Sequence, residues 1–129
     1  MQFIEKNSFN VRSAVYHLKK DGASLEFLLL PMAHVGSKEF YNEVSRRLAA
    51  CDLILAEGVN SRKGRLLLID ERDRRLITCL KNLYHSKQQD EKIVGVVYGA
   101  RHMRNAVCFL LGGLNYKVSK AEWITIFDL

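Results

Sequence analysis

The first quarter of the chain alternates apolar and polar residues in a way that predicts two strands. Residues 11–20 alternate with a period of two, as a strand does when only one of its faces is buried. Asp21 and Gly22 then supply a two-residue turn that favours a hairpin, and residues 24–32, SLEFLLLPM, continue as a second apolar run. We therefore expect an antiparallel hairpin at the start of the sheet.

The next segment combines a helical pattern with a short apolar run. Ser37 can cap a helix in which Phe40, Val44 and Leu48 recur every four residues and share one face. Residues 52–56, DLILA, follow this helix with almost no linker. A strand, a helix and a second strand in this order are typical of a parallel βαβ unit.

The middle of the chain is predicted to hold a connector and a second helix. The polar segment 60–65, NSRKGR, is the expected connector, and residues 66–69 are expected to add a helical turn before a helix that follows Asp70. That helix carries one apolar stripe, as expected for a helix packed on a sheet. The residues of the stripe are Leu76, Ile77, Leu80, Leu83 and Tyr84.

The last third of the chain contains the most strand-like run. Residues 93–98, IVGVVY, are mostly β-branched and do not alternate, which predicts a strand buried on both faces at the centre of the sheet. A helix over residues 101–111 should end at a glycine pair, and residues 116–119 and 122–127 predict two final strands. The predicted class is α/β, with a mixed sheet in two or three layers, a parallel βαβ core and antiparallel strands at both chain ends.

The composition places this pattern in one domain, residues 1–129. Hydrophobic residues make up 48% and charged residues 26% of the chain, which is the balance of a globular protein with a core. No apolar run approaches the ~18 residues that a membrane span requires, and the first residues lack the pattern of a signal peptide. We therefore expect a cytoplasmic protein without a membrane span.

Charge and cysteine content narrow the choice of partners. The formal net charge is +6, but the basic residues are scattered in doublets such as Arg46-Arg47, without interleaved aromatic residues. This distribution favours a solvated positive surface and argues against nucleic acid as the partner. The three cysteines, Cys51, Cys79 and Cys108, lack CxxC spacing and are expected to be buried thiols in a reducing compartment.

Three predicted strands are each followed by a residue that can ligate a metal or transfer a proton. His34 follows the second strand, Glu57 ends the DLILA run, and His102 comes shortly after the central strand. If these strands are parallel, the three side chains converge at the rim where α/β sheets bind ligands. Two imidazoles and a carboxylate can bind a divalent metal or act as acid and base. Taken singly, each histidine is better explained as a helix cap or a hydrogen-bonded core residue, and Glu57 as an exposed loop residue. The coincidence of all three at strand ends is what favours a site.

A charged pair lies on the apolar side of the second predicted helix. Helical spacing puts Arg72 four residues before Leu76, and Asp73 four residues before Ile77. Buried charges are costly unless they are paired or face a polar pocket, so the pair is a candidate for the same site. The alternative is that Asp73 only complements the helix dipole. His17 and His85 are predicted to face solvent and to ligate nothing.

Four segments of the chain resemble one known family. These segments are PMAHVGSKEFYNEV, DLILAEGV, DERDRRLITCL and IVGVVYGARHM, and with the residues between them they span about residues 24–127. In this order they resemble the motifs of the TraB/PrgY/GumN group. That group is related to the Tiki metalloproteases and more distantly to erythromycin-esterase-like and ChaN-like proteins.

The resemblance implies a mixed α/β fold with two GxxH motifs and a glutamate that face one cleft. The second motif matches Gly99 and His102, and the first matches His34, although its glycine is replaced by Pro31. The family's acidic strand end matches Glu57. The start of the family's helix matches Glu71, Arg72 and Asp73. Many relatives also carry a long helical segment before this helix, and only residues 60–69 stand in its place here.

These observations lead to two hypotheses of function. In the first, the chain is a metal-dependent, peptidase-like hydrolase in which His34, Glu57 and His102 hold Mn²⁺, Co²⁺ or Zn²⁺, and Arg72 and Asp73 support the site. In the second, it is a regulatory module of the pheromone-shutdown type, which binds a peptide or small molecule in the same cleft without turnover. The apolar third helix leaves a homodimer as a further alternative.

Overall fold

The computed structural model describes residues 1–33, 35–57, 66–69, 73–86 and 92–129. The strands in this part of the chain are β1 (Ile4–Lys6), β2 (Asn10–Lys19), β3 (Glu26–Met32), β4 (Leu53–Glu57), β5 (Leu66–Ile69), β6 (Ile93–Gly99) and β7 (Lys117–Asp128). The helices are α1 (Lys38–Ala49), α2 (Asp73–Tyr84) and α3 (Ala100–Cys108), with a π-helical turn, η1 (Phe109–Gly113), after α3.

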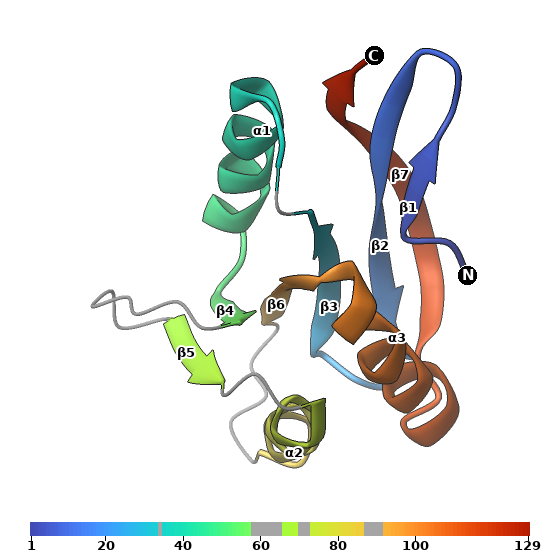
Figure 1. Cartoon of the computed structure of the whole chain (residues 1–129). Coiled ribbons are helices and arrows are strands. Elements are labelled where there is room, and N and C mark those ends of the chain that lie inside the picture. The colour runs from blue at the N-terminus through green and yellow to red at the C-terminus, as the bar shows by residue number, and fades with distance from the viewer. Residues whose placement is uncertain (34, 58–65, 70–72, 87–91) are drawn as a thin grey trace.

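The described strands form one seven-stranded mixed sheet (Figure 1). Its order is β1-β2-β3-β6-β4-β5, and β7 also pairs with β2. The strands β3, β6, β4 and β5 are parallel, whereas β1, β2 and β7 pair antiparallel with their neighbours. The predicted α/β class is therefore confirmed, with its parallel core, N-terminal hairpin and central strand β6.

The helices cover opposite faces of the sheet and make three layers. On one face Phe40 and Val44 of α1 pack in a cluster with Leu28 and Leu30 of β3. On the other face α2 and α3 pack in a second cluster with Tyr98 and the other inward residues of β6. From β3 the chain passes β6 to reach β4, and from β5 it returns in the opposite direction across the sheet to β6. Because crossovers between parallel strands are right-handed, this reversal puts α1 and α2 on opposite faces.

The local signals at the start of the chain act as predicted. Gly22 adopts φ +79° in the turn that joins β2 to β3, a conformation that suits glycine. Ser37 caps α1, since its side chain accepts a hydrogen bond of 3.1 Å from the backbone N–H of Phe40. These two signals fix where the hairpin turns and where the first crossover helix begins.

Tertiary pairing changes three of the predicted elements. Residues 66–69 form the strand β5 rather than a helical turn, because this apolar run pairs with β4 in parallel register. The two predicted final strands are one strand, β7, which pairs with β2 along its whole length through two irregularities. The strand β1, which the sequence pattern did not indicate, pairs with the start of β2. The predicted connector 60–65 lies outside the described residues.

The cysteines are only partly as expected. Cys51 and Cys79 are partly buried and Cys108 is exposed, so the prediction of three buried thiols is wrong for Cys108. This thiol lies at the end of α3, on the side of the helix that turns away from the sheet. Among the described residues, no helix is long and apolar enough to cross a membrane.

A close approach of α1 to β6 depends on Gly95. A Cβ atom at this position would lie 3.0 Å from both Cys51 Sγ and Leu48 Cδ2. The backbone N–H of Asp52 also donates a hydrogen bond of 2.9 Å to the carbonyl of Ile93. The end of α1 is therefore held directly against the amino end of β6, and a larger residue would separate the two.

We predict that Gly95→Val lowers the free energy of unfolding by about 1–3 kcal/mol, the usual cost of overpacking a core. Urea unfolding followed by circular dichroism measures the change. Gly112→Ala is the matched control, because nothing lies within 4 Å of a Cβ at Gly112, and it should change stability by no more than about 0.5 kcal/mol. Equal stability of the two variants would contradict the close packing of α1 on β6.

Candidate functional site

The carboxyl ends of three parallel strands meet at one rim of the sheet. Met32 at the end of β3 pairs with Gly99 at the end of β6, and Ala56 of β4 pairs with Val97 of β6. The chain leaves β3 towards α1 on one face and leaves β6 towards α3 on the other. This divergence between neighbouring parallel strands is the topological switch point at which open α/β sheets bind ligands. We call this rim the carboxyl crevice.

Two of the candidate residues are placed at the carboxyl crevice by the backbone. Glu57 is the last residue of β4, and His102 is the third residue of α3, partly buried and just after β6. Neighbouring strands lie about 4.8 Å apart, so the ends of β3 and β4 are separated by about 10 Å across β6. The strand order therefore brings the backbone of Glu57 and the start of α3 to the same rim, as a shared site requires.

The remaining candidate residues are less fully described. Asp73 is the first residue of α2. His34 and Arg72 lie outside the described residues, and so do the side chains of Glu57 and Asp73. In the part of the chain with described side chains, no group of three His, Cys, Asp or Glu residues is arranged to hold a metal.

Pro31, three residues before His34, is accommodated inside β3. It is buried and pairs with Tyr98, and the parallel register continues unbroken to Met32 and Gly99. Its carbonyl accepts a hydrogen bond of 2.6 Å from the buried Ser13 hydroxyl of β2. The proline therefore leaves the strand intact up to the residue before the loop that contains His34.

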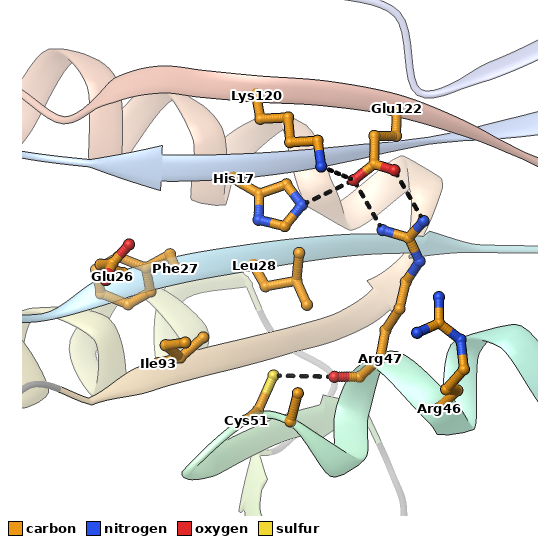
Figure 2. Close-up of a pocket in the computed structure, with 11 residues that line it drawn as sticks. His17, Glu26, Phe27, Leu28, Arg46, Arg47, Cys51, Ile93, Lys120 and Glu122 are labelled. Atoms are coloured by element: carbon orange, nitrogen blue, oxygen red, sulfur yellow. Dashed lines mark hydrogen bonds and ion pairs between the residues drawn. The ribbon is translucent and has the colours of Figure 1, made fainter.

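A hollow lies at the opposite end of the parallel strands from this rim. It is a cavity of about 280 Å³ between the end of α1 and the amino ends of β3 and β6, and we call it the amino-end cavity (Figure 2). It combines charged and apolar side chains. Its lining residues are His17, Glu26, Phe27, Leu28, Arg46, Arg47, Ala50, Cys51, Ile93, Lys120 and Glu122.

Three basic groups converge on one carboxylate of this cavity. Arg47 donates two hydrogen bonds of 3.1 Å, one to each oxygen of Glu122. Lys120 Nζ lies 3.3 Å, and His17 Nε2 3.2 Å, from Oε1 of the same carboxylate. The bidentate geometry is the stronger kind of ion pair, and it joins α1 to the edge strand β7.

The ion network holds two carboxylates in their charged form. Hydrogen bonds from Arg47, more than those from Lys120 and His17, lower the pKa of Glu122 to about 2. Hydrogen bonds from Arg46 and Arg47 lower the pKa of Glu43 to about 2 as well. Arg47 thus bridges two carboxylates while its own side chain is only 14% exposed.

The thiol in the amino-end cavity is poorly suited to nucleophilic chemistry. Burial, assisted by the charge of Asp52, raises the pKa of Cys51 to about 11. Since the thiolate is the reactive form, Cys51 is a weak nucleophile at neutral pH. The cavity is therefore better suited to reversible binding than to covalent catalysis.

Sequence reasoning did not find the amino-end cavity. His17 was predicted to face solvent and Arg46-Arg47 to be scattered surface charge, whereas the structure brings His17 and Arg47, though not Arg46, to Glu122. The four-residue spacing of Glu43 and Arg47 signals an ion pair along the helix. No local pattern indicates that residues 75 positions apart will meet, because that contact depends on β7 pairing with β2.

Comparisons with protein-family models, with curated proteins and with solved structures find no match for this chain. The assignment of function therefore depends on the residues and geometry described above.

We predict that Glu122→Gln makes stability less sensitive to acid. Glu43 and Glu122 have folded-state pKa values of about 2, below the ordinary 4.5. Their contribution to stability is therefore present above about pH 4.5 and is lost as the pH falls through about 2. Urea unfolding from pH 6 to pH 2 should show a shallower decline for the variant than for the wild type.

The control for this experiment is Arg47→Met, which removes the guanidinium that both carboxylates share. It should also flatten the decline, because Glu122 loses its main hydrogen-bond donor and Glu43 loses one of its two. A decline as steep as that of the wild type in both variants would show that the ion network does not stabilise the folded chain.

Proposed function

We propose that the chain is a metal-dependent, peptidase-like hydrolase that acts at the carboxyl crevice. The observation that carries this proposal is the parallel adjacency of β3, β6 and β4, which brings the chain segments of His34, Glu57 and His102 to one rim. Binding at such a rim follows from the divergence of the loops rather than from any one residue. The four motifs shared with the TraB/PrgY/GumN group support the same site.

The donor set suits a divalent metal such as Mn²⁺, Co²⁺ or Zn²⁺. Two imidazoles and one carboxylate are a common set of ligands for these ions, and His34, Glu57 and His102 would hold the metal. When bound, such a metal polarises a carbonyl and makes water a stronger nucleophile at neutral pH. Arg72 and Asp73 would position or stabilise this site.

The alternative is a binding module that holds a peptide or small molecule in the carboxyl crevice without turnover. It is favoured by Pro31, which departs from the family's first GxxH motif, and by the short segment 60–69 in place of a long helical one. A longer helical segment could form a lid over the substrate or contact it, and the ten residues of segment 60–69 are short for that role. Both proposals place the ligand at the same residues and differ in the chemical outcome.

The proposed setting of the protein is the cytoplasm. The three cysteines are free thiols, which fits a reducing compartment. We propose peptides or small molecules as ligands rather than nucleic acid, and a homodimer through the region of α3 is the alternative assembly. The exposed Cys108 at the end of α3 offers a direct position for a probe of that assembly.

We predict that the protein binds Mn²⁺, Co²⁺ or Zn²⁺ through His34 and His102. In isothermal titration of protein purified without chelator, His34→Ala and His102→Ala should each weaken binding by more than tenfold, since loss of outer-shell partners alone costs about 10–100-fold. His85→Ala is the control, because His85 lies exposed after α2. The affinity of this variant for the metal ion should equal that of the wild type. Metal binding that is unaffected by both crevice variants would exclude the metal site.

We predict that Glu57→Gln abolishes hydrolysis of peptides or esters while the fold is retained. Incubation with a mixed peptide and ester library, followed by mass spectrometry, detects the products. Glu5→Gln, on the strand β1, should keep full turnover. Saturable binding of library members that remain intact would support the binding module and contradict the enzyme.

A further inference from the structure

The amino-end cavity has the make-up of a binding site for a small anion with an apolar body. Figure 2 shows His17, Lys120 and Arg47 converging on Glu122, with Leu28 and Ile93 beneath them in the view. The basic groups and Glu122 come from α1, β2 and β7, whereas β3 and β6 supply Glu26 and the apolar residues Leu28 and Ile93. A ligand with one polar end and one apolar end would find both kinds of surface in a single cavity.

The balance of charge in the network favours an anion that carries one negative charge. Three cations, Arg46, Arg47 and Lys120, face two carboxylates, Glu43 and Glu122, so the network has at least one excess positive charge. The remaining acid of the cavity, Glu26, is paired with Lys19 at 3.3 Å. A monocarboxylate would offset this excess charge.

Hydrogen-bond donors remain accessible for such a ligand. The side chains of Arg46 and Lys120 are 69% and 64% exposed, and a carboxylate bound to them would share their donors with Glu43 and Glu122, which they already contact. Lys120 carries three N–H donors, and its contact with Glu122 engages only part of this capacity. Arg47, in contrast, is committed to Glu43 and Glu122 and supports the wall of the cavity.

The volume and floor set the size of the ligand. A cavity of about 280 Å³ is at the lower limit of the range of ligand pockets, which suits a molecule of few heavy atoms. Leu28 is buried, and Ile93 and Cys51 add apolar surface beside it. An aliphatic or aromatic body on this floor would bury apolar area that is otherwise in contact with water.

We propose that the amino-end cavity is a binding site for a small organic monocarboxylate, held by Arg46 and Lys120 at its charged end and by Leu28 and Ile93 along its apolar body. The site lies at the opposite end of the parallel strands from the carboxyl crevice. It is therefore distinct from the proposed hydrolytic site, and neither proposal depends on the other. The helix α1 begins near one site and ends at the other.

The test is titration of ¹⁵N-labelled protein with hexanoate, hexanamide and hexylammonium, followed by amide chemical shifts. Hexanoate should give saturable shifts at residues 26–28, 46–51 and 120–122. The neutral amide and the cation share the apolar body but lack the carboxylate, so they should give none. Arg46→Gln combined with Lys120→Gln should raise the hexanoate Kd by about tenfold or more.

Two further variants separate binding in the cavity from general attraction to a basic protein. Lys81→Gln combined with Arg104→Gln removes the same charge from α2 and α3, on the other face of the sheet, and should leave the hexanoate Kd unchanged. Ala50→Trp should fill the cavity and abolish binding while the remaining spectrum is preserved. Equal shifts with hexanamide, shifts outside the three segments, or the same loss in the α2–α3 variant would overturn the proposal.

Discussion

The position of β6 between two parallel neighbours is the constraint on which the rest of the structure depends. Its backbone pairs with β3 on one edge and β4 on the other, and its side chains are buried under helices on both faces. The connection from β3 to β4 runs in one direction across the sheet, and the connections from β5 to β6 and from β6 to β7 run in the other. Because such crossovers are right-handed, α1 covers one face of β6, and α2 and α3 cover the other. Gly95 lets α1 come close enough to complete that burial.

Both candidate sites follow from this arrangement. At the carboxyl end the chain diverges to opposite faces, which opens the carboxyl crevice beside Glu57 and the start of α3. At the amino end α1 finishes against Ile93, and its last turn, together with β7, surrounds the amino-end cavity. The first site is suited to ligands held by strand-end residues, and the second to ligands held by a charged network above an apolar floor.

Much of the fold and of the carboxyl crevice could be predicted from local patterns. The Asp21-Gly22 turn, the Ser37 cap and the unbroken apolar run of β6 each have a short-range cause, and together they gave the parallel core. Residues 66–69 were mispredicted because four aliphatic residues suit a helix or a strand, and only pairing with β4 decides between them. The amino-end cavity was missed for the same reason, since Arg47 meets Glu122 only after β7 has paired along β2.

Chemical crosslinking measures directly whether the chain segments of His34 and His102 meet at one rim of the sheet. In a chain with the native cysteines replaced, His34→Cys and His102→Cys should be joined by a short bismaleimide in the folded protein and not in urea. A pair at His34→Cys and Lys120→Cys should not be joined, because position 34 follows the carboxyl end of β3 in the sequence, whereas Lys120 lines the cavity at the amino end of that strand. Crosslinking of the second pair but not of the first would contradict the account.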